Sequence, residues 1–348
     1  MATTTVGRPL LSRAPVRRRS RPVLALLLGL GALAVVAVLS VAVGSAPTTP
    51  AEVWHALVTP TGAPTDIVVR ELRVPRTLLG LVVGAALGVA GVLMQGHTRN
   101  PLADPGLLGI SGGAAFCVVL STTVLGVTGV AGYIWFAFVG AALAALLVFT
   151  LGAAGRGGPT PVTLALAGLA VSELLLAVTS AMVLGDGPSL DAYRFWAAGA
   201  LDDRGADLTL QVLPFVVVGL ALAAVNSRAL DVLALGEDSA RGLGQNILRA
   251  RIVGLTGVTL LTGAAVSVSG PIGFVGLVAP HVVRSLAGPA HGRLIPLAAL
   301  VGAVLVLAAD VVGRVVVRPG ELPVGIVLGI VGAPFFIAMV RRRRMVRL

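Results

Sequence analysis

The amino-acid sequence predicts an all-α polytopic membrane protein with about ten transmembrane helices. Of its 348 residues 56% are hydrophobic and only 12% are charged, and the mean hydropathy of +0.98 lies well above that of soluble domains. Apolar runs of about 20 residues recur along the chain, each long enough for a helix that crosses a bilayer. The arginines fall mostly between these runs, so the net charge of +11 indicates membrane topology rather than a nucleic-acid partner.

The two ends of the chain are basic. Residues 1–22 hold six arginines and no acid, and residues 341–348 hold five arginines. The apolar run after the first tail, residues 23–43, is longer than the core of a typical cleaved signal peptide. We therefore expect a cytoplasmic tail over 1–22, a ten-helix transmembrane domain over 23–340 that begins with a retained helix, and a second cytoplasmic tail over 341–348.

Polar intervals separate the remaining spans. Residues 44–76 carry several prolines and mixed charge, and residues 96–106 are too polar and too rich in proline to continue a helix that faces lipid. Residues 152–159 form a turn, and residues 185–207 contain five aspartates around a Tyr-Arg-Phe-Trp stretch. The predicted spans cover, in order, residues 23–43, 77–95, 107–127, 133–151, 161–184, 208–225, 252–268, 272–286, 294–312 and 324–340.

Glycine patterns predict where helices come close. Gly80, Gly84, Gly88 and Gly91 recur at about four-residue spacing in the second span, and such a face lets a neighbouring backbone approach closely. Residues 105–109, Pro-Gly-Leu-Leu-Gly, also find a weak echo in residues 271–276, Pro-Ile-Gly-Phe-Val-Gly. The two segments fall on opposite sides of the membrane in this arrangement, as the inverted repeats of a transporter would.

Arginine distribution predicts the orientation. Ten spans place both termini on one side, and 19 of the 26 arginines lie in the tails and intervals on that side. By the positive-inside rule that side is the cytoplasm. The acids lie more often on the outer side. The aromatic anchors also fall near the outer face: Trp54, Trp135, Trp196, Tyr133 and Tyr193. We expect a multi-pass protein of a bacterial cytoplasmic membrane with both termini in the cytoplasm.

Several chemistries are excluded or disfavoured. The chain has no lysine, so it cannot supply a Walker A loop, and any ATP hydrolysis must occur on a partner chain. Cys117 is the single cysteine, and His97, His281 and His291 are dispersed without ligand spacing, so we expect no protein-bound metal and no cofactor. No nucleophile and base pattern predicts a catalytic residue. An ion-coupled secondary transporter stays an alternative, although no chain of midplane acids supports it.

Two acids lie within predicted spans and are functional candidates by default. Glu173 adjoins Ser172 and could form a hydrogen bond across helices. Asp310 precedes Arg314 by four residues, so the simpler interpretation is an ion pair on one helix face.

The longest charged interval, residues 226–251, contains the stretch Leu-Gly-Glu-Asp-Ser-Ala-Arg-Gly-Leu-Gly at 235–244. Glu237 and Arg241 are spaced to brace one helical turn, and Gly236 and Gly244 permit tight turns at its ends. From spacing alone, a cytoplasmic contact surface and an ordinary solvated loop both remain open.

Several long motifs, in order and at matching spacing, resemble those of one family. They are the segments 99–111 (RNPLADPGLLGIS), 234–237 (ALGE), 270–281 (GPIGFVGLVAPH), 309–310 (AD), 321–325 (ELPVG) and 332–334 (GAP). From about Arg70 to its end the chain resembles the permease subunits of iron-siderophore, haem and cobalamin ABC importers, often called the FecCD family. The resemblance implies a type II ABC importer permease that dimerises around a central pathway. The partners that the resemblance implies are a second permease subunit, identical or paralogous, a cytoplasmic ABC ATPase dimer and an extracytoplasmic substrate-binding protein.

The resemblance also implies roles for particular residues. The ATPase-coupling element matches Leu235, Gly236, Glu237, Ala240, Arg241, Leu243 and Gly244. The positions that receive acidic residues of the binding protein match Arg73, Arg76 and Arg314, with Arg70 and Arg318 as less certain members; anchoring to lipid headgroups is the alternative for these arginines. The outer gate matches Trp196 and Gly199, where an interfacial tryptophan anchor is the alternative. The implied substrate is a metal chelate, with a ferric siderophore favoured over cobalamin or haem.

Overall fold

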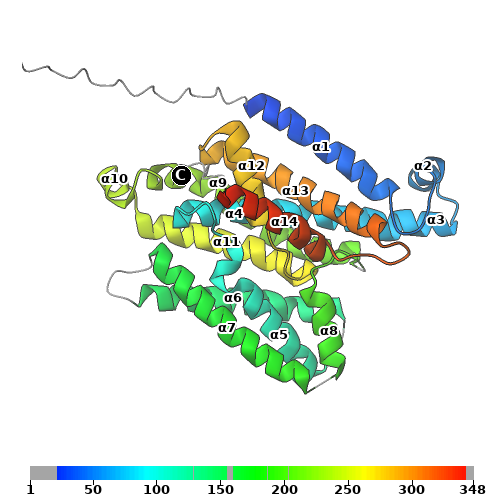
Figure 1. Cartoon of the computed structure of the whole chain (residues 1–348), viewed down its shortest axis with the longest axis horizontal. Helices are drawn as coiled ribbons and strands as arrows, with labels where there is room; N and C mark the ends of the chain where they lie inside the picture. The colour runs from blue at the N-terminus through cyan, green and yellow to red at the C-terminus, as the bar shows by residue number, and fades with distance from the viewer. Residues whose placement is uncertain (1–21, 128, 155–159, 186, 203, 342–348) are drawn as a thin grey trace, which may run out of the picture.

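The computed structural model describes residues 22–127, 129–154, 160–185, 187–202 and 204–341, and the regular structure in these ranges is helical, with no strand (Figure 1). Both basic tails, Pro22 and Arg341 aside, lie outside the described residues, as do Asp186 and Asp203. Each of the ten predicted spans coincides with one helix. These are α1 (Pro22–Ala42), α4 (Val74–Thr98), α5 (Ile110–Leu125), α6 (Val130–Ala153), α7 (Pro161–Leu184), α9 (Ala206–Leu233), α11 (Ile247–Ser269), α12 (Val275–Ala287), α13 (His291–Val316) and α14 (Val324–Arg341).

The predicted intervals are more helical than the sequence indicates. Seven helices are long and apolar enough to cross a membrane, and α5, α12 and α14 are shorter apolar helices among the residues described. The interval 44–76 contains α2 (Pro50–Val58), α3 (Pro64–Ile67) and the π-helical stretch η1 (Val68–Arg73). The 3-10 helix η2 (Pro105–Leu108) precedes α5, α8 (Gly187–Ala197) follows α7, and α10 (Glu237–Gly242) lies between α9 and α11.

Two predicted boundaries are wrong, the end of α9 by eight residues and the start of α11 by five. Little of the interval 226–251 is loop, because α9 continues to Leu233, α10 lies at its centre and α11 begins at Ile247. Polarity marks where a helix leaves lipid, whereas the helix itself ends only where its backbone loses intrahelical hydrogen bonds. The charged ends of α9 and α11 therefore project beyond the apolar part of the bundle.

Helix α4 lies at the centre of the bundle, and its glycine face packs against α13 as predicted. A Cβ atom at Gly84 would lie 2.5 Å from the carbonyl oxygen of Gly302, and one at Gly88 would overlap the carbonyl of Ala298. The two backbones are thus in direct contact, an approach that larger side chains would block.

The two echoed segments meet inside the bundle. A Cβ atom at Gly276, in the first turn of α12, would lie 2.7 Å from Cδ of Pro105 in η2, and Gly91 of α4 abuts the backbone of Gly276. The segments that precede α5 and α12 are therefore placed beside α4 in the interior, rather than apart at opposite surfaces. This placement accounts for the shortness of α5 and α12, which begin within the bundle.

The bundle has two distinct ends (Figure 1). The α2 end brings together the end of α1, the segment α2–α3–η1, the start of α4 and the connection between α13 and α14, as the Arg314–Ser40 and Ser45–Glu321 hydrogen bonds show. The α10 end brings together α10, the end of α4 and the starts of α11 and α13.

Candidate functional site

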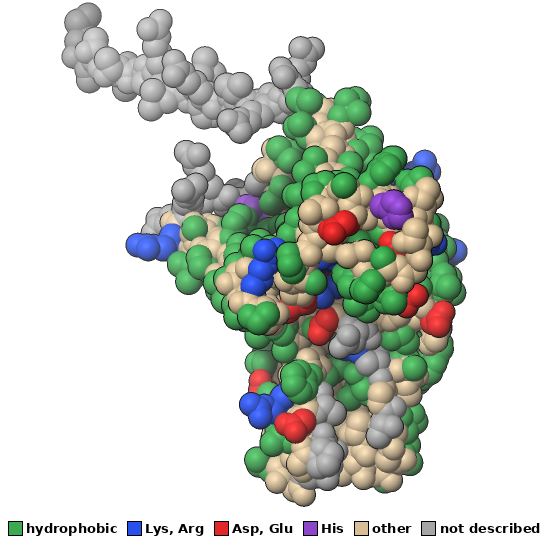
Figure 2. Space-filling model, turned by 90° about the vertical axis from the view of Figure 1, so that its right-hand side faces the viewer, with side chains coloured by type: hydrophobic (Ala, Val, Ile, Leu, Met, Phe, Trp, Pro, Cys, Tyr) green, Lys and Arg blue, Asp and Glu red, His purple; other side chains and the backbone are tan. Residues whose placement is uncertain are grey.

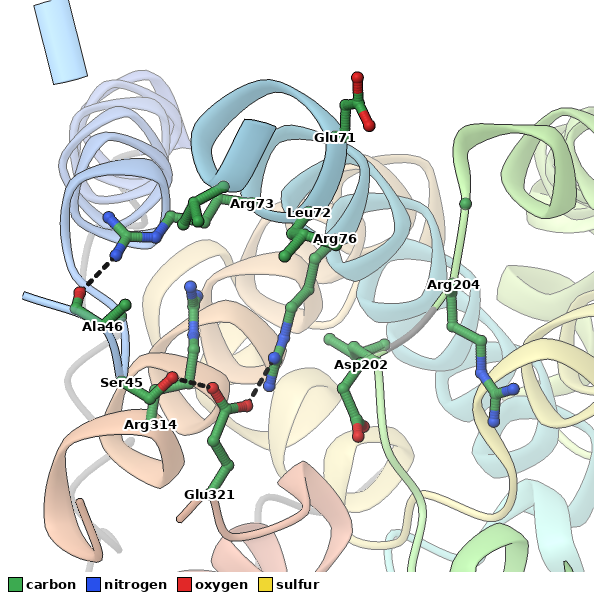
Figure 3. Close-up of a pocket in the computed structure, with 14 residues that line it drawn as sticks. Ser45, Ala46, Glu71, Leu72, Arg73, Arg76, Asp202, Arg204, Arg314 and Glu321 are labelled. Atoms are coloured by element: carbon green, nitrogen blue, oxygen red, sulfur yellow. Dashed lines mark hydrogen bonds and ion pairs between the residues drawn. The ribbon is translucent and has the colours of Figure 1, made fainter. Parts of the chain in front are cut away.

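A cavity of about 690 Å³ opens at the α2 end (Figure 3). Its lining mixes small residues with charged side chains from α4, η1, α13 and the loops. The lining residues are Gly44, Ser45, Ala46, Val68, Glu71, Leu72, Arg73, Arg76, Leu201, Asp202, Arg204, Gly205, Arg314 and Glu321. The structure therefore brings together Arg73, Arg76 and Arg314, the three arginines assigned by resemblance to partner docking.

Arg76 connects two carboxylates at this cavity. Its Nε and Nη2 atoms donate to Oδ1 of Asp310 at 2.9 and 2.7 Å, and its Nη1 donates to Oε2 of Glu321 at 2.6 Å. The other carboxylate oxygen of Asp310 lies 2.7 Å from Nη2 of Arg314, which confirms the predicted ion pair on one face of α13. The Asp310 side chain is 1% exposed and that of Arg76 is 12% exposed, so this network is largely shielded from solvent.

Arg73 and Arg314 are buried and hold the end of α1. Arg73 donates to the carbonyl oxygens of Val41, Ala42 and Ala46 at 2.7–3.1 Å, and Arg314 donates to those of Ser40 and Val43 at 2.9 and 3.1 Å. The last carbonyls of a helix have no intrahelical partner, so these two guanidinium groups cap α1 and fix it to α4 and α13. The structure thus gives both arginines a structural role that their positions in the sequence did not indicate.

Glu321 was not predicted as a site residue, yet it occupies the exposed face of Arg76. Ser45 donates to its Oε1 at 2.7 Å, opposite the contact with Arg76 (Figure 3). Burial alone would raise the pKa of Glu321, but the hydrogen bond from Ser45 and the charge of Arg76 outweigh burial and hold this pKa below its usual value. Glu321 is therefore ionised at neutral pH and forms an ion pair with Arg76.

The segment that follows α8 ties three helices together. Ala200 donates its backbone N–H to the carbonyl of Ser269 at 2.8 Å, and Gly325 donates to the carbonyl of Gly199 at 2.9 Å. Gly199 has a φ of +69° and its Cα faces the carbonyl of Pro271, so a side chain would not fit there. Trp196 is buried at the end of α8. The residues assigned to the outer gate therefore lie at the junction of α8, α11 and α14.

Phe274 adds strain to the same region. It precedes α12 with a φ of +67°, which is a rare conformation for a bulky residue, and its ring lies against Gly332 of α14. This contact links the broken start of α12 to α14.

At the α10 end, Glu237 is the centre of an arginine cluster. Its Oε1 lies 2.5 Å from Nη2 of Arg251 on α11 and 3.6 Å from Nη2 of Arg99, which follows α4, and its Oε2 lies 3.6 Å from Nη2 of Arg241. The predicted pair with Arg241 is present, but the shortest contact, with Arg251, spans fourteen residues. Glu237 therefore joins α10 to the ends of two long helices.

The C-terminus of α10 is closed by a Schellman motif. Gly244 has a φ of +77° and donates to the carbonyl of Arg241 at 2.9 Å, and Gln245 donates to the carbonyl of Ala240 at 2.9 Å. Ala240 is fully buried, whereas Leu235 and Leu243 are 64% and 66% exposed. The stretch 235–244 thus contains a short helix that is anchored by buried Ala240 and flanked by two exposed leucines.

The model of the FecCD transport family matches residues 32–342. The chain belongs to the FecCD transport family. It is 45% identical over 276 residues to the ferric enterobactin transport system permease protein FepD of Escherichia coli K12, covering 79% of this chain and 82% of that protein. It is 44% identical to the Fe(3+)-citrate import system permease protein YfmD of Bacillus subtilis 168, covering 81% and 84%.

Other members and one solved structure agree with this assignment. The FecCD chain is 41% identical to the cobalamin import system permease protein BtuC of Halobacterium salinarum, covering 80% of this chain and 74% of that protein. A structure of a metal-chelate type ABC transporter in an inward-facing conformation has a TM-score of 0.79 at 29% identity and covers 92% of this chain and 99% of that chain. The predicted type II importer fold is confirmed.

The contact of Gln95 with α12 in this FecCD chain was not predicted from the sequence. Pro280 lacks an N–H, so the carbonyl of Gly276 has no helical partner in α12. Nε2 of Gln95 on α4 donates to that carbonyl at 3.2 Å, and Oε1 of Gln95 accepts from Nη1 of buried Arg284 at 2.5 Å. Gln95 thus supplies the hydrogen bond that Pro280 removes from α12, and it holds α4 against that helix. Only the Gly-x-x-x-Pro spacing inside an apolar run hinted at this contact.

The histidines take part in local hydrogen bonds. Nε2 of His97 lies 2.8 Å from Nδ2 of Asn226, and Nδ1 of His291 lies 2.7 Å from Oδ1 of Asp231. Over the described ranges no group of three or more His, Cys, Asp or Glu side chains is arranged to hold a metal ion.

Proposed function

We propose that the metal chelate carried by this importer permease is a ferric siderophore. The family match over residues 32–342 supports the class of protein, and several relatives of high identity are named for ferric siderophore or ferric citrate transport. Relatives named for cobalamin and hemin make those chelates the alternative substrates. The chelate enters as a whole ligand complex, so the pathway needs shape and weakly polar walls rather than metal ligands.

The proposal places the protein in a bacterial cytoplasmic membrane with the α10 end in the cytoplasm and the α2 end outside. The excess of arginines at the α10 end supports this orientation, because arginine-rich loops are retained in the cytoplasm. The aromatic residues near the α2 end support it as well. Both termini are then cytoplasmic.

ATP hydrolysis belongs to a separate ATPase dimer, and α10 is the element on which it acts. The support is structural: α10 is short, is fixed by Glu237 and Gly244, and is flanked by exposed Leu235 and Leu243. A lever must transmit displacement without deforming, and the contacts of Glu237 pass a displacement of α10 to Arg251 on α11 and Arg99 beyond α4. The two leucines would fill an apolar recess on the ATPase.

The cavity at the α2 end is the proposed contact for acidic residues of a substrate-binding protein. All three arginines line the cavity, but Arg73 and Arg314 are bound to α1 and would shape the site, whereas the side chain of Arg76 is more exposed, at 12%. A docking carboxylate would compete with Glu321 for Nη1 of Arg76. The three arginines thus act together, with unequal roles.

The pathway would form between this chain and a second permease subunit. Helix α14 supports this proposal because Ile330, Val331 and Ile337 are exposed on it, beside the junction of Trp196, Gly199 and Phe274. The backbone hydrogen bond from Gly325 to Gly199 would let the outer gate move as one unit with α14.

Uptake measurements test the proposed substrate and coupling together. Cells that lack this gene would be given iron-poor medium and radiolabelled ferric siderophore, with the chain restored as wild type, as Glu237→Arg or as Asp238→Arg. We expect restored uptake with wild type and with Asp238→Arg, because Asp238 is fully exposed. Glu237→Arg should insert and assemble but lose uptake while ATP hydrolysis continues, since it places a fourth cation among Arg99, Arg241 and Arg251.

The outcomes separate the substrate from the coupling element. Normal uptake by Glu237→Arg would reject the role of α10. If wild type restores no ferric siderophore uptake while the ATPase and binding protein are present, labelled cobalamin and haem become the substrates to test.

A further inference from the structure

Helix α2 has an exposed apolar face that does not line the cavity at the α2 end. At 100° per residue, Trp54, Leu57 and Val58 share one arc of the helix, and their side chains are 69%, 46% and 56% exposed. Glu52 and His55 lie on a separate polar arc. The apolar arc is therefore a distinct surface between the polar arc and the face that packs on the protein.

The third face of α2 fixes it to the bundle. Val53 and Ala56 are buried in a small cluster with Val69 of η1, and Val41 of α1 packs against this cluster. The N-terminus is closed by a capping box in which Thr49 and Glu52 exchange hydrogen bonds. Helix α2 is thus a formed helix with a set rotation, and its apolar arc cannot turn inward.

The contact with Val41 determines the depth of α2 in the membrane. Helix α1 ends at Ala42, and most of its long apolar run is exposed, as expected of a helix with a face toward lipid. Val38 and Leu39, one turn before the end of α1, are 67% and 43% exposed. Because α2 packs beside Val41, its apolar arc lies at the level where the hydrocarbon face of α1 ends.

We propose that α2 is an interfacial helix that inserts Trp54, Leu57 and Val58 into the edge of the bilayer. The arc continues the lipid-facing surface of α1, and a tryptophan at this level matches the amphipathic ring to the headgroup boundary. Glu52 and His55 face water, and α2 carries no arginine, so insertion rests on apolar burial rather than on anionic lipid. Figure 2 looks onto this end and shows hydrophobic side chains between charged ones at its surface.

Site-directed spin labelling tests this proposal on two faces of one helix. In a Cys117→Ala background, Trp54→Cys and Leu57→Cys would report the apolar arc and His55→Cys the polar arc. Val38→Cys on α1 is the reference for lipid, and Asp238→Cys on α10 is the reference for water. The full-length chain would be placed in phosphatidylcholine nanodiscs, and collision rates with oxygen and with a water-soluble nickel chelate would be measured.

We expect the ratio of oxygen to nickel collisions at Trp54→Cys and Leu57→Cys to exceed that at His55→Cys severalfold and to approach the ratio at Val38→Cys. Ratios equal to that of Asp238→Cys would overturn the proposal by placing the arc in water. Protection from both reagents would also overturn it, because a protein surface would then cover the arc. We expect these ratios to stay unchanged when roughly 30% of the lipid is phosphatidylglycerol, because α2 has no arginine to bind anionic headgroups.

Discussion

Replacement of Asp310 by asparagine should destabilise the protein more than any other single change at the α2 end. Asp310 is 1% exposed and lies between Arg76 at 2.7–2.9 Å and Arg314 at 2.7 Å. Removal of one partner from a buried ion pair typically costs about 3–5 kcal/mol, because a buried charge loses its compensation. Arg76 keeps Glu321 and Arg314 keeps the carbonyls of α1, so we expect a loss of about 3 kcal/mol in the free energy of unfolding.

The single cysteine provides the assay. Cys117 is only partly exposed in the folded chain, so its reaction with a thiol-specific dye reports unfolding in mixed micelles of dodecyl maltoside and increasing dodecyl sulfate. Asp202→Asn is the matched control, because Asp202 lines the same cavity but is exposed, and it should change the free energy by less than about 0.5 kcal/mol.

The double variant Asp310→Leu with Arg76→Met isolates the cause, because Arg76 bonds only to carboxylates, whereas Arg314 also caps α1. If the loss in Asp310→Asn comes from uncompensated cations, removal of one cation with the acid should restore part of the stability. The reasoning is refuted if Asp310→Asn and Asp202→Asn unfold at the same dodecyl sulfate fraction.

Three further predictions concern other contacts. Arg76→Gln should weaken binding of the substrate-binding protein to nanodiscs by about tenfold or more, as expected for loss of a charge-assisted hydrogen bond, whereas Glu321→Gln should not weaken it; unchanged affinity in Arg76→Gln would contradict the docking proposal. Gly244→Val should lower uptake with little change in folded protein, because a β-branched residue does not tolerate a φ of +77°, and Gly242→Ala, inside α10, should transport normally. Gln95→Leu should cost about 2–3 kcal/mol in the same unfolding assay, since it leaves a carbonyl and buried Arg284 without their partner; an unchanged midpoint would dismiss the role of Gln95.

The sequence alone predicted the ten spans and the helical turn at α10. Apolar length and glycine or proline breaks are local properties, so each span coincides with a helix, and Gly236 and Gly244 marked the ends of α10 correctly. The resemblance placed Arg73, Arg76 and Arg314 at one end of the bundle, and the structure brings them to one cavity. The resemblance could not indicate that Arg73 and Arg314 are buried, because these two arginines bind backbone carbonyl groups, which every residue carries.

Tertiary structure decided which groups complete one another across the chain. Gln95 meets the carbonyl freed by Pro280 at a separation of 181 residues, Ser45 meets Glu321 at 276, and Arg76 meets Asp310 at 234. None of these pairs has a signature in hydrophobic period or in local spacing, because a buried polar group needs only a partner of the right geometry, wherever in the sequence that partner lies. Apolar length along the chain is enough to identify the segments that lie in lipid, whereas the partners of the polar groups between them follow from the packing of α4 against α12 and α13.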